Sequence, residues 1–247
     1  LAIVVVAELK LIPKPDSNVL VSAYFDSIED GISGVNNIIK SRIFPSTIDF
    51  MDKNSINTVE QFFPSGLNVN KECMLLIEVD GSKISVEEQA GMIINILNDS
   101  GASDIRKSED EVSRENIWTA RRSSYAATAK LGLDVVSDDI IVPRNSLLKM
   151  IKGCIEICDK HNLKLCMVGH IGDGNIHPQI ALNLENDEEF KSYISAKTEM
   201  YSLALELGGT ISSEHGIGIE KMSFIEQTVD IEALEQMRRI KMLFDPN

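Results

Sequence analysis

The sequence has few basic residues: its 247 residues include 24 Lys and Arg against 38 Asp and Glu, so the formal net charge is −14. A general nucleic-acid binder needs a basic surface that displaces phosphate counterions, and electrostatic docking on anionic lipid needs one as well. The composition therefore argues against both. The hydrophobic fraction of 43% is that of a globular chain and argues against disorder.

Long apolar runs are also missing. The longest, Leu1–Ala7, is far shorter than the roughly 20 residues that a membrane helix needs. No charged segment precedes it and no cleavage motif follows it, so we do not interpret it as a signal peptide. Because the chain begins with Leu1 in a strand-like run and stops just after a helical pattern, we interpret it as a fragment.

Paired cysteine motifs and phosphate-binding glycine loops are absent as well. The four cysteines form no Cys-x-x-Cys pair, and nothing resembles a GxGxxG or Walker loop. We interpret the cysteines as small buried hydrophobes in a reducing, cytoplasmic compartment, with a metal or disulfide role as the alternative. They are Cys73, Cys154, Cys158 and Cys166.

The hydrophobic pattern alternates between strands and helices with short connections. Direct hairpins favour antiparallel pairing, so we expect an α+β fold with an antiparallel sheet and helices on one face. A Ser85/Glu88 capping box predicts one helix start and Asn186/Glu189 predicts another. The predicted strands are 1–11, 19–25, 44–51, 73–79, 139–142, 163–168 and 175–182; clear helical patterns follow at 147–158, 187–207 and 231–244.

Two of the four histidines lie in one glycine-rich segment, Gly169–His177. Asp173-Gly174 is a strong two-residue hairpin turn, and a turn there places His170 directly opposite His177, with Cβ atoms about 5 Å apart. Two imidazoles at that separation can chelate one metal ion. The alternative is a polar hairpin with two surface histidines.

A second glycine-rich segment places a carboxylate beside a base, Glu214-His215. Neighbours in an extended chain point to opposite faces, so Glu214 could complete a two-His, one-carboxylate metal site while His215 faces a substrate. Such a set leaves coordination positions open, as catalytic metal sites do. The flanking glycines offer backbone that a flat cofactor could approach; they are Gly208, Gly209, Gly216 and Gly218.

Arg121 and Arg122 follow closely on the only tryptophan, Trp118. In so acidic a chain this arginine pair is a candidate clamp for an anion, because Arg grips a carboxylate through two nitrogens. The alternative is a solvated helix face. His161 ends a predicted helix, where a cation suits the helix dipole, and we interpret it as structural.

Six motifs together resemble the C-terminal, substrate-side domain of the FAD-linked oxidases of the vanillyl-alcohol-oxidase superfamily. Within it, the chain is most similar to the group of glycolate oxidase FAD subunits, D-lactate dehydrogenases and D-2-hydroxyglutarate dehydrogenases. The resemblance covers nearly the whole chain. In family order the motifs are Glu8–Pro15, Trp118-x-x-Arg121, Asp139–Pro143, Gly169–His177, Ser213–Gly218 and Asp245–Asn247.

The resemblance implies two ferredoxin-like halves whose sheet caps a flavin. Residues 1–15 would be the end of the FAD-binding domain with its linker, and residues 16–247 the substrate or cap domain. The resemblance also implies a divalent metal, usually zinc, on His170, His177 and Glu214.

It implies the remaining roles too. His215 would be the base near the flavin, with Glu214, His215 and Gly216 touching the cofactor. The substrate would touch Asn175 and Arg121, the latter through its carboxylate. The FAD-binding domain is not among these residues, so we expect FAD to be bound mainly outside this chain and the chain alone to be inactive.

The expected reaction is oxidation of a D-2-hydroxy acid to the 2-oxo acid by hydride transfer to FAD, with the metal activating the hydroxyl. Some 2-hydroxyglutarate-type members carry a Lys where this chain has Ser137-Asp138-Asp139, which favours a short acid of the glycolate or D-lactate type. The alternatives are a metal-dependent hydrolase and a non-catalytic cap or interaction module. Expected partners are the small acid, the FAD-binding domain, and partner subunits or a homodimer, with the cytoplasm, or the inner-membrane periphery through partners, as the location.

Overall fold

The computed structural model describes residues 4–108 and 110–246, and the chain divides into two units. The larger unit is Pro15–Ser213, and the smaller comprises Leu1–Lys14 and Glu214–Asn247. The predicted strand at 1–11 is wrong for residues 4–11, which are exposed and form no strand, while residues 1–3 lie outside the described residues. An apolar run becomes a strand only where a neighbouring strand satisfies its backbone groups.

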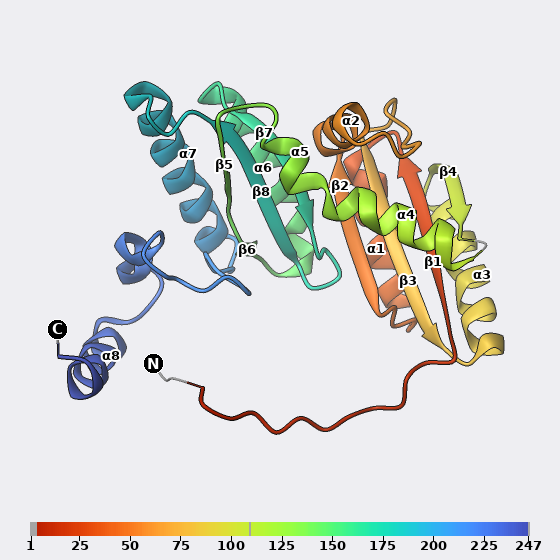
Figure 1. Cartoon of the computed structure of the whole chain (residues 1–247), viewed down its shortest axis with the longest axis horizontal. Helices are drawn as coiled ribbons and strands as arrows, with labels where there is room; N and C mark the ends of the chain where they lie inside the picture. The colour runs from red at the N-terminus through yellow and green to blue at the C-terminus, as the bar shows by residue number, and fades with distance from the viewer. Residues whose placement is uncertain (1–3, 109, 247) are drawn as a thin grey trace. The chain divides into compact units, whose positions relative to one another are not determined.

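One antiparallel sheet forms the centre of the larger unit (Figure 1). Seven of its eight strands lie in the order β4-β1-β3-β2-β7-β8-β5, and the eighth, β6, pairs with β8. The strands are β1 (Ser17–Phe25), β2 (Thr47–Asp52), β3 (Cys73–Gly81), β4 (Ala102–Lys107), β5 (Asp134–Ser137), β6 (Ile140–Ile141), β7 (Lys164–Gly169) and β8 (Asn175–Leu182).

The sheet is two ferredoxin-like halves joined edge to edge, as predicted. The first half has the strand order β4-β1-β3-β2. In the second half β6 and β7 flank β8, and an isolated bridge between Ile141 and Thr210 stands where the fourth strand would be. The halves meet where β2 pairs with β7, with Phe50 opposite Gly169 and Met51 opposite Val168. We call this junction the seam.

Helices cover both faces of the sheet, which differs from the one-face arrangement expected from the sequence. Helices α1, α3, α6 and α7 form one layer, and α2, α4 and α5 cross the other face (Figure 1). The helices of this unit are α1 (Ile28–Lys40), α2 (Lys53–Phe62), α3 (Lys83–Asp99), α4 (Glu111–Arg122), α5 (Ser124–Thr128), α6 (Leu147–Lys160) and α7 (Asp187–Glu206), with a 3₁₀ turn at Arg144–Ser146.

The second helical layer has a core of its own. Leu20 and Tyr24 of β1 and Met74 and Leu76 of β3 alternate toward it and pack against α2, α4 and α5. Each fully buried side chain of this size contributes about 1.5–3 kcal/mol of hydrophobic stabilisation. The layer matters for function because it holds α4, and therefore Arg121, against the seam.

The caps and the cysteines follow the sequence with one exception. Asn186 caps α7, as predicted, whereas α3 begins one turn earlier than predicted because Ser82, and not Ser85, accepts a backbone hydrogen bond as its cap. The four cysteines are buried and unpaired, as predicted. Burial raises the pKa of each thiol, for Cys158 to about 12, so these sulfurs stay protonated and inert.

The smaller unit contains a 3₁₀ segment, Met222–Gln227, and helix α8 (Ile231–Phe244), which was predicted over the same residues. Ion pairs lie on its surface, for example between Arg238 and Glu226 at 3.0 Å. Asn247, the last residue of the sixth family motif, lies outside the described residues. Throughout the described part of the chain, we find no helix that combines the length and apolar character needed to span a membrane.

Candidate functional site

The site is built where the seam ends. In the antiparallel pairing of β2 with β7, Phe50 lies opposite Gly169. Continuing this register by one residue on each strand places Asp49 opposite His170. Directly opposed residues share a face of the sheet. Asp49 is only 2% exposed, and its Oδ1 lies 2.7 Å from His170 Nδ1.

The hairpin between β7 and β8 brings the two predicted histidines together in a different register from the predicted one. Val168, not His170, lies opposite His177. The loop closes through bonds from the Asp173 and Asn175 amides to the His170 carbonyl. Only Gly174 of the turn pair has a positive φ, +83°, whereas the predicted type I′ turn needs two such residues.

Despite that correction, the two imidazoles lie next to each other. Their ring centroids are 5.3 Å apart and the rings are nearly perpendicular. The imidazole of His170 is 42% exposed, and His177 is buried. The hairpin therefore presents one accessible and one buried imidazole on the same side of its loop.

Both imidazoles are oriented through Nδ1. His170 Nδ1 faces the Asp49 carboxylate, and His177 Nδ1 lies 3.3 Å from the Asp138 carbonyl oxygen. Because an ionised carboxylate and a carbonyl can only accept, each Nδ1 carries the proton, and in the neutral ring the lone pair is on Nε2. A metal-binding histidine typically has this arrangement. The donor chemistry of the pair therefore fits a divalent metal such as zinc.

Asn175 lies on the same strand as His177, two residues earlier, and so on the same face. Its amide nitrogen donates to Asp139 Oδ1 at 2.7 Å and to the Ile140 carbonyl at 3.2 Å. Its Oδ1 is buried and has no hydrogen-bond partner among the described residues. A buried acceptor of this kind is a natural place for a ligand donor.

Asp139, like Asp49, is a buried carboxylate that the sequence analysis did not single out as a site residue. It is fully buried, and besides Asn175 it accepts hydrogen bonds from the Ser212 hydroxyl at 3.1 Å and the Ser213 amide at 2.7 Å. Its Oδ1 also lies 4.0 Å from His177 Nδ1. Asp139 therefore ties the hairpin to the last residues of the larger unit, directly before Glu214 in the sequence.

The predicted arginine pair is split. Arg121 Nε lies 3.0 Å from Asp49 Oδ2, and its side chain is 11% exposed. Arg122 instead pairs with Glu115 on the helix surface, and Trp118 donates to Glu78 Oε2 at 2.7 Å. Only Arg121 is therefore part of the site; Arg122 fits the solvated-face alternative.

Glu214, His215 and Gly216 belong to the smaller unit and are described within it. His215 Nε2 lies 3.7 Å from Glu214 Oε1, and both side chains are about half exposed. Gly216 has φ +78°, a left-handed conformation that favours glycine. A Cβ added to Gly216 would meet no atom of the described residues within 4 Å.

Other glycines of the two motifs serve the fold itself. A Cβ on Gly174 would lie 2.2 Å from the Val142 carbonyl oxygen, and one on Gly209 would lie 2.1 Å from that of Ile141. Gly209 therefore permits close contact between two backbone segments. His161 is structural, as predicted: it ends α6 and pairs with Glu199 at 3.0 Å.

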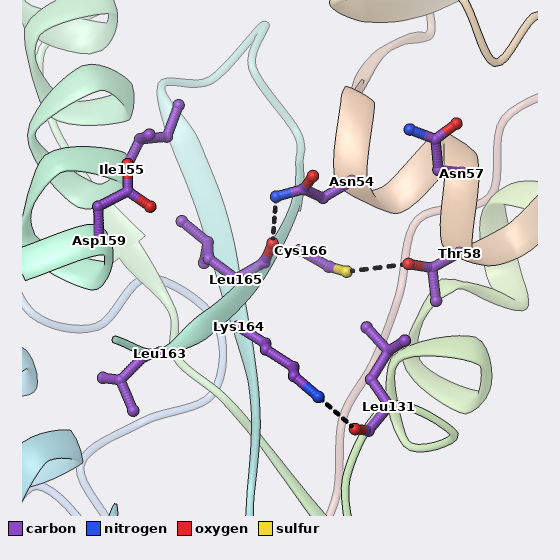
Figure 2. Close-up of a pocket in the computed structure, with 10 residues that line it drawn as sticks. All are labelled: Asn54, Asn57, Thr58, Leu131, Ile155, Asp159, Leu163, Lys164, Leu165 and Cys166. Carbon is purple, nitrogen blue, oxygen red and sulfur yellow. Dashed lines mark hydrogen bonds between the residues drawn. The ribbon is translucent and has the colours of Figure 1, made fainter. Parts of the chain in front are cut away.

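A cavity of about 250 Å³ lies at the other end of β7 (Figure 2). Two of its polar side chains form hydrogen bonds within the fold: Asn54 donates to the Leu165 carbonyl at 2.8 Å, and Lys164 donates to the Leu131 carbonyl at 3.2 Å. Within the part of the chain that is described, its lining includes none of the predicted site residues. The seam therefore remains the candidate functional site.

The antiparallel sheet of two ferredoxin-like halves has counterparts among solved structures. The structure is similar to p-cresol methylhydroxylase, with a TM-score of 0.72, 11% identity and coverage of 95% of this chain and 52% of that one. It is also similar to 4-ethylphenol oxidase from Gulosibacter chungangensis, with a TM-score of 0.69, 14% identity and coverage of 96% and 53%. These likenesses show the fold.

Residues 14–247 match the family described as FAD linked oxidases, C-terminal domain, and the chain belongs to that family. It is 33% identical to the glycolate oxidase subunit GlcD of Bacillus subtilis over 100% of this chain and 52% of the relative. It is 31% identical to a probable mitochondrial D-lactate dehydrogenase of Danio rerio over 100% of this chain and 50% of the relative. The chain thus spans about half the length of these relatives.

Proposed function

We propose that this chain is the substrate-side part of an FAD-dependent enzyme that oxidises a short D-2-hydroxy acid to the 2-oxo acid. The observation that carries the proposal is Asp49, whose two oxygens hold a candidate metal-binding imidazole, His170, and a candidate carboxylate-binding guanidinium, Arg121. The names of the relatives, glycolate oxidase and D-lactate dehydrogenase, support the same substrate class.

His170, His177 and Glu214 would hold a divalent metal, with zinc favoured by two nitrogens and one oxygen. The support is the Nδ1 anchoring of both imidazoles and the tether between Asp139 and Ser213, the residue bonded to Glu214. A bound divalent cation polarises a hydroxyl oxygen and lowers its pKa. Two histidines and one carboxylate leave a position for that hydroxyl.

The other residues act on the substrate directly. Arg121 would bind the carboxylate of the acid, and Asn175, whose buried Oδ1 has no hydrogen-bond partner among the described residues, would be a second substrate contact. His215 would take the proton of the 2-hydroxyl, which must be within hydrogen-bond reach of the ring. A proton leaves from the oxygen and a hydride leaves from Cα, so the alcohol loses two electrons and becomes a carbonyl group.

FAD would be bound mainly by a domain outside this chain, with Glu214, His215 and Gly216 along its edge. The left-handed backbone of Gly216, with no described atom near its missing Cβ, suits the approach of a flat ring. Flavin supplies a hydride acceptor. We place the whole enzyme in the cytoplasm. We expect it to associate with partner subunits or with a second copy, because the Bacillus subtilis relative is named a subunit.

The test uses the full-length protein with its flavin, mixed anaerobically with a panel of D-2-hydroxy acids. The proposal predicts bleaching of the oxidised flavin by short acids such as glycolate or D-lactate, and about one divalent metal per chain by elemental analysis. Hydrolytic turnover of ester or amide substrates by the metal-loaded chain, with no flavin bleaching, would favour a hydrolase instead.

A further inference from the structure

Asp49 brings together three parts of the chain that are far apart in sequence. It lies on β2, while Arg121 lies in the last turn of α4 and His170 follows β7. Its Oδ1 lies 2.7 Å from His170 Nδ1, and its Oδ2 lies 3.0 Å from Arg121 Nε. One carboxylate therefore fixes the positions of both groups relative to each other.

The position of the Asp49 carboxylate restricts its movement. The Asp49 side chain is short, 3% exposed, and attached to a strand inside the sheet rather than to a loop. Its two oxygens lie in one rigid plane, so the imidazole and the guanidinium are held on a common frame. If the carboxylate moves to follow the imidazole, its contact with the guanidinium is distorted, and the reverse holds as well.

We propose that Asp49 is a positioning residue: by fixing the spacing between Arg121 and His170, it favours acids whose hydroxyl is on the carbon next to the carboxylate. The inference rests on the proposed function, in which Arg121 binds the carboxylate and the metal on His170 binds the hydroxyl. In a 2-hydroxy acid these two groups are on adjacent carbons, whereas in a 3-hydroxy acid an extra methylene separates them. A fixed spacing suits one of the two and penalises the other.

Two substitutions separate charge from geometry. Asp49→Asn keeps the shape but removes the charge that pairs with Arg121 and replaces one oxygen with an NH₂ group, so it can no longer present an oxygen to both His170 and Arg121. Asp49→Glu keeps the charge and both acceptors but adds one methylene, which moves the imidazole relative to the guanidinium. Asp104→Asn is the matched control, because Asp104 also pairs with an arginine, Arg106, at 2.9 Å, but lies on the edge strand β4.

The experiment uses the full-length flavoprotein and two readouts. The first is zinc affinity, measured by competition with a chromophoric chelator. The second is the ratio of kcat/KM for D-2-hydroxybutanoate to that for 3-hydroxybutanoate, which have the same atoms. Circular dichroism and flavin content establish that each variant is folded.

We expect Asp49→Asn to weaken zinc binding by about 10- to 100-fold, as loss of a carboxylate behind a metal-binding histidine typically does. We expect both Asp49 variants to lower the substrate ratio by at least about tenfold, mainly through KM for the 2-hydroxy acid, while Asp104→Asn changes neither readout. A folded Asp49→Asn or Asp49→Glu protein with an unchanged substrate ratio, or an Asp49→Asn protein with unchanged zinc affinity, would overturn the inference. If the unsubstituted enzyme oxidises neither acid nor any other hydroxy acid, the proposed function itself fails.

Discussion

Replacing Asp52 with asparagine should make the chain more stable at neutral pH. Asp52 is the cap of α2, and its Oδ1 accepts hydrogen bonds from the Ser55 amide at 2.8 Å and, across the seam, from the Met167 amide at 2.9 Å. The carboxyl is 4% exposed, and burial raises its pKa from 3.8 to about 6, although these hydrogen bonds act in the opposite direction. Asparagine keeps an acceptor oxygen for both amides and removes the charge.

The direction and size of the stability change follow from the difference in the Asp52 pKa between the folded and unfolded states. Because the pKa is higher in the folded state, the stabilisation it gives is fully present below pH 3.8 and is lost as the pH rises through about 6. A pKa difference of one corresponds to about 1.4 kcal/mol, so ionisation of Asp52 costs about 3 kcal/mol of folding free energy once the pH is well above 6. About 1.4 kcal/mol of that cost arises between pH 5 and pH 7.5.

Urea unfolding of the unsubstituted chain and Asp52→Asn at pH 5 and pH 7.5 measures this directly. The difference in unfolding free energy between the two proteins should grow by about 1.4 kcal/mol in favour of Asp52→Asn as the pH rises. Asp80→Asn, at an exposed aspartate on β3, is the control. A difference that does not change with pH, or that moves in favour of aspartate, would show that the buried carboxylate does not carry the raised pKa.

The remaining predictions concern the two motifs. His177→Ala in the metal-loaded full-length protein should lose most of its zinc, whereas His161→Ala should keep it, as measured by elemental analysis after dialysis; equal zinc in both would contradict the assigned ligand. His215→Ala should bind substrate yet fail to bleach the flavin in anaerobic stopped flow, and rapid flavin reduction by this variant would sink the base assignment. Gly209→Ala should destabilise the chain by about 1–3 kcal/mol in urea unfolding, because its Cβ would lie 2.1 Å from the Ile141 carbonyl oxygen. The control is Gly91→Ala, in α3, where no described atom lies within 4 Å of the new Cβ; it should stabilise the chain by up to about 1 kcal/mol. If Gly209→Ala left the unfolding free energy unchanged, the two backbone segments would be able to move apart.

Features set by local sequence could be predicted. The apolar spacing of α6 matches the residues that it buries, and β8 begins and ends where its pattern predicted. The presence of two histidines on one hairpin also follows from a short, glycine-rich segment. In each case the interacting residues are close together in sequence, so periodicity and turn chemistry contain the answer.

Features set by long-range pairing could not be predicted. Asp49 is in the site only because β2 pairs with β7, and nothing in the sequence around Asp49 indicates its distant partner. The same is true of Asp139. It lies in the motif Asp139–Pro143, but its contacts with Ser212 and Ser213 depend on the fold. The hairpin register was wrong by two residues because only one residue of the Asp173-Gly174 pair adopts a positive φ.

The most direct test of the central claim is anaerobic flavin reduction by D-2-hydroxybutanoate in the full-length protein, measured as isolated, after chelation, and after zinc is restored. We expect fast bleaching, a loss of at least about tenfold in its rate on chelation, and recovery with zinc, with no bleaching by the L enantiomer. Bleaching that is equally fast after complete removal of the metal would contradict a metal on His170, His177 and Glu214 as part of the reaction.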